Sequence, residues 1–219
     1  MTVLLILVTF AVFITIDYLR NRGVPAEEPT AATPQPRLMP DVVAGFAVAP
    51  NVCYHPGHSW AVRDNPGLVR IGLDDFAARL IGKASRILLP QRQRWIRQGQ
   101  KICTVERDGM KVEMVSPIEG EVAEINEAVL RNPELALRDP YGEGWLATVK
   151  SPDAETNFRN LLSGKLARRW MEETAKRLLE KMPRWAGAVA QDGGVAVHDL
   201  CAHLPNQEWA ELAREFFLS

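Results

Sequence analysis

The sequence predicts a mainly β domain that is followed by α-helices and preceded by one apolar N-terminal helix. Three observations predict this order. Short runs rich in β-branched residues alternate with Gly and Pro through the middle of the chain. Amphipathic helical patterns replace them after residue 151. The first sixteen residues carry no charged side chain. We therefore expect four segments, at residues 1–19, 20–45, 46–150 and 151–219.

The N-terminal segment is expected to be a transmembrane helix. Residues 1–16 would extend roughly 24 Å as an α-helix, against a hydrocarbon core of ~30 Å, and Tyr18 and Leu19 lengthen the apolar stretch. A cleaved secretory signal is the alternative, but the segment has no basic start and no small-residue cleavage motif. Because Arg20 and Arg22 follow it, the positive-inside rule places the remaining chain in the cytoplasm. We expect a single-pass anchor in the inner membrane.

The segment after the anchor is expected to be an extended spacer. It holds five prolines between residues 21 and 40, with Glu, Thr and Ala between them. Proline-rich chains of this composition are semi-rigid and do not form a packed core. We expect the spacer to separate the folded domain from the membrane.

The middle segment is predicted to form the β-domain. Residues 111–115 alternate between two faces, so that one face can be buried while the other is wetted. Asp108-Gly109 is a two-residue hairpin signal, since Gly adopts positive φ without a steric penalty. The close spacing of turns favours a small sandwich or barrel. The expected strands are 69–73, 85–89, 101–105, 111–115 and 120–125.

Two helices are predicted after residue 151. In the first, apolar residues recur at multiples of four, and Pro183 ends the run. The second follows Asn206, a good N-cap residue. Both helices are expected to pack on the barrel, and the alternative is that one apolar stripe docks a partner helix. The apolar sides would consist of Leu162, Leu166, Trp170, Leu178 and Met182 in the first helix and of Trp209, Leu212, Ala213, Phe216 and Phe217 in the second.

One stretch of the middle segment is more specific than the rest. It runs from Val105 to Pro117 and continues as Gly120-Glu121-Val122. It resembles the hairpin of lipoyl domains and of the H-protein of the glycine cleavage system, in which Val-Glu-x-x-Lys leads to Ser-Pro-x-x-Gly-Glu-Val. The resemblance covers roughly residues 55–150. It also rests on His58-Ser59-Trp60, Val69-Arg70-Ile71-Gly72, Leu89-Pro90, Pro140-Tyr141 and Gly144-Trp145.

This resemblance implies a flattened β-barrel of two short sheets, a barrel-sandwich hybrid, with the hairpin at one edge. It also implies that the lipoyl lysine of the family would stand seven residues before Ser116, and that position is Gly109. Lys111 is the fallback, but it is expected in the second strand and off the hairpin tip. We therefore expect no cofactor, and lipoate only if Lys111 is modified.

Charge is distributed unevenly along the chain. The net charge of −1 argues against a nucleic-acid partner. Between Phe76 and Val105, however, there are seven basic residues and no acidic one. A solvated positive face is the ordinary interpretation, and contact with anionic lipid or with an acidic subunit is the functional one. The candidate contact residues are Arg92, Arg94, Trp95 and Arg97.

Cysteine and histidine residues form two local clusters. Three cysteines do not make a disulfide framework and suit a reducing compartment. Nitrogen and sulfur ligands of this kind bind zinc, but the spacings match no common zinc finger, and we expect no metal site. The candidates are Cys53, His55, His198, Cys201 and His203.

The chain lacks the common catalytic motifs: it has no Gly-x-Ser-x-Gly, no phosphate loop and no His-Glu-x-x-His. We therefore expect a protein that is not an enzyme. The first hypothesis is an accessory or scaffolding subunit of a larger bacterial membrane complex (respiratory, photosynthetic or transport), contacting lipids through residues 1–19 and other subunits through its domain. One alternative is a lipoylated carrier of a glycine-cleavage-like system that uses Lys111, and another is a lipid- or metal-responsive binding module.

Overall fold

The computed structural model describes residues 13, 15, 40–181, 199–202 and 204–217. The expected anchor at residues 1–19 therefore lies outside the described residues except for Phe13 and Thr15, and the spacer is described only from Pro40 onward. Among the residues that are described, no helix is both long enough and apolar enough to span a bilayer. The compact unit is Leu38–Ser219, and the following paragraphs concern this unit alone.

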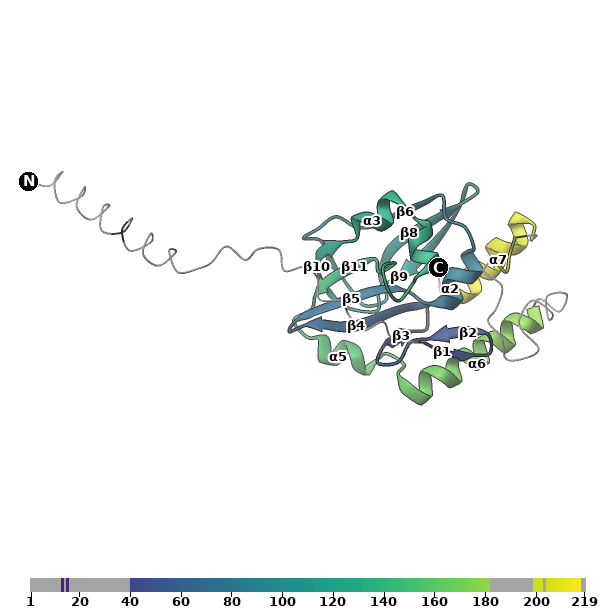
Figure 1. Ribbon diagram of the computed structural model, residues 1–219, viewed down its shortest axis with the longest axis horizontal. Helices are drawn as coiled ribbons and strands as arrows, with labels where there is room; N and C mark the ends of the chain where they lie inside the picture. Colours follow the sequence, from purple (N-terminus) through teal and green to yellow (C-terminus); the bar gives the residue numbers. More distant parts are fainter. Residues whose placement is uncertain (1–12, 14, 16–39, 182–198, 203, 218–219) are drawn as a thin grey trace, which may run out of the picture. The chain divides into compact units, whose positions relative to one another are not determined.

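The domain is mainly β, with all strand pairs antiparallel (Figure 1). A six-stranded sheet has the order β3-β4-β5-β11-β10-β7, a three-stranded sheet has the order β6-β8-β9, and β1 pairs with β2. The strands are β1 (Asp41–Val43), β2 (Phe46–Val48), β3 (Cys53–His55), β4 (Ser59–Asn65), β5 (Leu68–Leu73), β6 (Arg86–Leu88), β7 (Trp95–Ile96), β8 (Lys101–Arg107), β9 (Met110–Val115), β10 (Gly120–Ile125) and β11 (Ala147–Lys150).

The five predicted strands are present as β5, β6, β8, β9 and β10, so the expected β-domain with C-terminal helices is confirmed. The pair β4–β5 shows how the core fixes the sheet. Trp60 lies opposite Gly72, and a Cβ at Gly72 would sit 2.5 Å from the indole ring. The indole Nε1 donates to the carbonyl of Pro140 at 3.1 Å. The register of these strands therefore depends on glycine leaving room for a buried tryptophan.

Helix α2 (Asp75–Ile81) begins at two adjacent carboxylates, Asp74 and Asp75. Asp74 is the N-cap, and its Oδ1 accepts from the amide of Ala77 at 2.8 Å. The other oxygen of Asp74 lies 2.7 Å from Nδ1 of His58, and both side chains are buried. Three short helices follow along the chain: α3 (Glu127–Arg131), α4 (Glu134–Arg138) and α5 (Ala154–Arg159).

Both C-terminal helices pack on the β-domain. Helix α6 (Gly164–Lys181) lies along β1, β2 and β3, and α7 (Asn206–Phe217) lies against β9 (Figure 1). The predicted apolar side of α7 is correct, because all five of its residues are buried.

The predicted stripe of α6 is only partly correct: Leu178 is buried and Trp170 packs against the core, whereas Leu166 is 58% exposed. Met182 lies outside the described residues. Each step of four residues turns 40° beyond a full helical turn, so a strict period of four winds around the helix. The residues that α6 buries are Ala167, Met171, Thr174, Ala175 and Leu178.

One edge of the six-stranded sheet is closed by a segment that follows α5. The amide of Tyr54 in β3 donates to the carbonyl of Leu162, and the amide of Leu162 donates back to Tyr54, both at 2.8 Å. The opposite edge strand is β7, which contains only two residues.

Candidate functional site

The β8–β9 hairpin is the candidate site, because it contains the motif that the sequence singles out. Its register pairs Arg107 with Met110 and Glu106 with Lys111. The two residues between the strands, Asp108 and Gly109, have φ of 47° and 82°. Positive φ at both central positions is typical of the tight turns that match the twist of a hairpin. The hairpin tip is therefore an Asp-Gly turn, as predicted.

Gly109 occupies the second position of this turn. A Cβ placed there would meet no heavy atom within 4 Å, so the space around the tip is open. Lys111 lies in β9, one cross-strand pair below the turn. Its side chain is 64% exposed, and its Nζ lies 3.3 Å from Oε1 of Glu106. The structure thus places a primary amine near the tip but not at it.

The two faces of β9 differ as the alternation predicts from Lys111 to Met114, whereas Val115 is buried although alternation puts it on the outer face. Val112 and Met114 are buried, whereas Lys111 and Glu113 are exposed. Glu113 forms an ion pair with Lys101 across the strands. The outer face of the hairpin therefore carries charged side chains, while its inner face belongs to the core.

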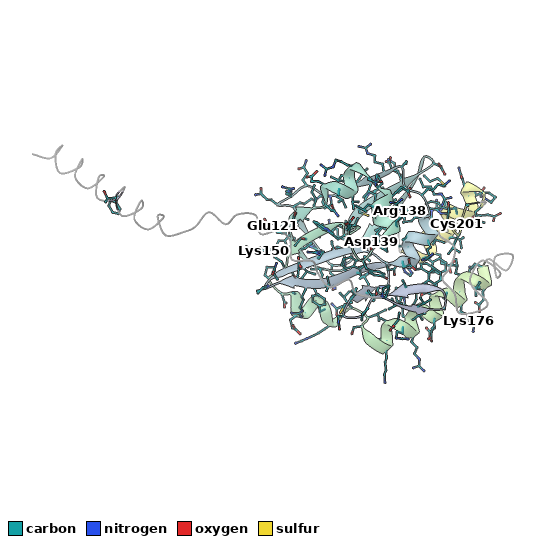
Figure 2. All side chains as sticks on the ribbon, in the orientation of Figure 1. Glu121, Arg138, Asp139, Lys150, Lys176 and Cys201 are labelled. Carbon is teal, nitrogen blue, oxygen red and sulfur yellow. The ribbon has the colours of Figure 1, made fainter. Side chains whose placement is uncertain are left out.

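The Ser-Pro-x-x-Gly sequence after β9 has a structural role at the base of the hairpin. Ser116 is fully buried, and its hydroxyl donates to the carbonyl of Ile118 at 2.6 Å. Gly120 has a φ of 154°, and a Cβ there would lie 2.3 Å from the carbonyl oxygen of Lys150. Glycine at this position lets β10 approach β11. The cross-strand partners Glu121 and Lys150 mark this end of the domain in Figure 2.

Arg107 anchors the tip end of the hairpin to the C-terminal segment. Its guanidinium is buried and donates to the carbonyls of Ile81 and Cys201. It also lies 3.1 Å from Oδ1 of Asp199, and 5.7 Å from the ring of Trp209 in α7. Cys201 is labelled beside α7 in Figure 2. The sequence does not predict these contacts, because no local pattern links residues 92 positions apart.

The four candidate contact residues of the basic segment lie together around β7: Arg92 and Arg94 precede it, Trp95 is in it and Arg97 follows it. Arg92, Arg94 and Arg97 are exposed, and Trp95 is exposed by 49%. Arg92 lies 3.3 Å from Glu127 of α3.

The five metal-ligand candidates are only partly described. His198 and His203 lie outside the described residues. In the remaining part, no group of three or more His, Cys, Asp or Glu side chains could hold a metal ion. Nδ1 of His55 accepts from the amide of Gly57 at 3.0 Å. Cys201 is a free thiol, and its burial raises its pKa to about 12, which disfavours the thiolate that binds metals.

Comparisons with known proteins agree with the motif. The profile of the family described as "Glycine cleavage H-protein" matches residues 52–174, more than half of the chain. A "Probable glycine cleavage system H protein" of Aeropyrum pernix is 32% identical over 137 residues, which are 62% of this chain and 92% of that protein. A "Glycine cleavage system H protein" of Alteromonas mediterranea is 35% identical over 101 residues, 46% of this chain and 78% of that protein.

A solved glycine cleavage system H protein of Mycobacterium marinum is 24% identical, with a TM-score of 0.49, and covers 58% of this chain and 98% of its own. Because the family model matches more than half of the chain, the chain belongs to the glycine cleavage H-protein family.

These findings correct the first functional hypothesis. The expectation of an accessory or scaffolding subunit of a membrane complex is wrong, because the relatives are named glycine cleavage system H proteins. The expected single-pass location in the inner membrane is overturned by the same relatives. That hypothesis rested on the apolar residues 1–16 and on Gly109 at the position where the lipoyl lysine was expected.

Proposed function

We propose that this member of the glycine cleavage H-protein family is a carrier that bears a lipoyl group on Lys111 and catalyses no reaction itself. The observation that carries the proposal is the exposed amine of Lys111 beside the hairpin tip. It is the sole lysine between Lys101 and Lys150 in the sequence. Its partners would be the proteins of a glycine-cleavage-like system, because the relatives carry that name.

The residues around Lys111 fit such an attachment. The amine contacts one carboxylate, that of Glu106, and an exposed ion pair of this kind contributes little and opens readily. Lys111 stands two residues from Gly109, about 7 Å along a strand. The flexible four-carbon stem of lysine can cover much of that offset. Gly109 leaves open space at the turn, so an arm that starts at Lys111 could pass over the tip.

The proposed group would be joined through an amide at Nζ of Lys111, and its dithiolane would supply the group-transfer chemistry that the chain lacks. The chain itself holds the attachment point in a fixed register. Val112 and Met114 bury the inner face of β9, and the Asp-Gly turn fixes the tip. We further propose that residues 46–150 are the carrier domain and that residues 151–219 are an extension of it.

The test is the intact mass of the protein purified from its native host, compared with two variants. We expect a lipoyl adduct on the wild type that is absent from Lys111→Arg. Gly109→Lys in the Lys111→Arg background is the matched control, because it moves the lysine to the position at which the family carries it. An unmodified wild type beside a modified Gly109→Lys variant would overturn Lys111 as the carrier residue, since the modifying enzyme would then recognise the hairpin but not this lysine.

A further inference from the structure

We propose that the exposed surface formed by Arg94, Trp95 and Arg97, with Arg92 at its margin, binds an acidic surface of a partner protein. We call this surface the arginine–tryptophan patch. The proposal is independent of whether Lys111 is modified, because it rests on a different part of the domain.

The patch is held in a fixed conformation. Trp95 and Ile96 form β7, the edge strand that pairs with β10. Ile96 is buried, whereas the indole of Trp95 is exposed by 49%. The preceding loop is fastened to β10 by two backbone hydrogen bonds, from the amide of Gln93 to Val122 at 2.7 Å and from the amide of Val122 to Arg94 at 2.9 Å. A preformed surface needs little ordering when a partner binds.

The chemistry of the patch suits carboxylates. Arg94 and Arg97 have no carboxylate partner in the part of the chain that the structure describes. No lysine occurs between Lys83 and Lys101, so the charge of the patch comes from guanidinium groups alone. A guanidinium binds a carboxylate through two parallel hydrogen bonds, and Trp and Arg are the residues that dominate the energy of protein–protein contacts.

An acidic protein fits the patch better than an anionic membrane does. Glu121 is the cross-strand partner of Trp95, and Glu127 lies 3.3 Å from Arg92. These carboxylates would be repelled by a continuous layer of anionic headgroups, whereas a protein surface can place its own acidic groups opposite Arg94 and Arg97 alone.

The patch lies at the base of the hairpin rather than at its tip. The amide of Gly99, two residues after Arg97, donates to the carbonyl of Ser116 at 2.8 Å. Ser116 follows the last residue of β9, and Gly109 of the Asp-Gly turn lies seven residues, about 24 Å, away along that strand. A partner bound to the patch would therefore leave Lys111 accessible.

The experiment measures binding of fluorescein-labelled poly-L-glutamate to the full chain by fluorescence anisotropy at low and physiological salt. The double variant Arg94→Glu/Arg97→Glu is expected to bind about tenfold more weakly, since two attractive contacts become repulsive. Trp95→Ala is expected to lose about threefold through the lost apolar contact. The matched control is Lys165→Glu/Lys176→Glu, which makes the same change of charge at exposed positions of α6 and should bind as the wild type does.

Two outcomes would overturn the proposal. Equal losses in the patch variant and in the α6 control would show that binding follows net charge rather than the patch. Wild-type binding to vesicles of phosphatidylcholine and phosphatidylserine, lost in the patch variant and without binding of poly-L-glutamate, would show a lipid surface instead. Circular dichroism of each variant establishes that the fold is retained.

Discussion

Gly99 and Gly120 flank the β8–β9 hairpin and have positive φ, of 77° and 154°, but only Gly120 faces another strand. A Cβ at Gly120 would meet backbone atoms of Lys150, which cannot move without opening the β10–β11 pair. A Cβ at Gly99 would meet nothing within 4 Å. Substitution by alanine at Gly99 therefore tests the cost of positive φ alone, whereas substitution at Gly120 also tests the steric overlap with Lys150.

We expect Gly120→Ala to lower the free energy of unfolding by about 3 kcal/mol, because backbone strain is combined with a steric overlap. Gly99→Ala is the matched control and should cost about 1 kcal/mol, the penalty of positive φ alone. Urea denaturation followed by circular dichroism measures both values. Equal losses in the two variants would show that the approach of β10 to β11 does not require glycine.

At the scale of secondary-structure elements, the contact between the hairpin and the C-terminal segment depends on Arg107. This side chain is buried and donates hydrogen bonds to the end of α2 and to the segment before α7, and its guanidinium lies over the ring of Trp209 in α7. The indole Nε1 of Trp209 also donates to the carbonyl of Leu80 at 3.0 Å. The C-terminal extension is thus fastened to the end of α2 and to the hairpin at once.

We expect Arg107→Ala to lower the free energy of unfolding by about 3 kcal/mol, because it leaves buried carbonyls and the carboxylate of Asp199 without their donor. Hydrogen exchange of the amides of α7 should rise in this variant. Arg86→Ala is the control, since Arg86 is exposed on β6 of the same sheet and its loss should cost less than about 0.5 kcal/mol. Unchanged exchange in α7 would contradict the assigned role of Arg107.

Strands could be predicted from the sequence where residues of one short segment show the turn and the alternation themselves. Strand β10 was predicted at its observed bounds, because a turn precedes it and β-branched residues alternate within it. Six strands are not among the predicted ones. Strands β1, β2, β3 and β7 have only two or three residues, too few to show a period, and the longer β4 and β11 are also missed.

The candidate site divides in the same way. The turn at Asp108-Gly109 follows from its residue types, and the offset of Lys111 from Gly109 is what the resemblance to lipoyl hairpins implies. The burial of Arg107 does not, because its partners come from distant parts of the chain.

At the scale of the whole molecule, the barrel and the extension share one core. Apolar side chains of β2, α2 and α7 pack together, with the rings of Phe76 and Phe216 at 5.1 Å and those of Phe46 and Phe76 at 4.9 Å. The ring of His58 stacks on Phe76 at 4.2 Å and lies 4.8 Å from Trp170 of α6. The family match ends at residue 174, within α6 and before α7. Both helices are nevertheless part of the folded domain.

The stability of the whole domain should depend on pH through His55. Burial of its imidazole, with a contribution from the nearby charge of His58, lowers the pKa of His55 below its ordinary value of 6.5. The unfolded chain then takes up a proton at a higher pH than the folded chain does. The stabilisation is complete above pH 6.5 and is lost as the pH falls from there toward the lowered pKa of the folded state.

We expect His55→Asn to reduce this dependence on pH while keeping an acceptor for the amide of Gly57. The measurement is urea denaturation of the wild type and the variant at a series of pH values on both sides of 6.5. Parallel curves of unfolding free energy against pH for the two proteins would count against His55 as the titrating group.

The closure of β3 by Leu162 has a consequence for how copies of the protein meet at high concentration. An open strand edge is a template on which another chain can add, and growth into filaments needs two such edges. Tyr54 already has both of its main-chain partners in Leu162, and the far edge offers only the two residues of β7 between arginines. We expect the six-stranded sheet to add no strand from another copy for as long as the segment around Leu162 remains in place.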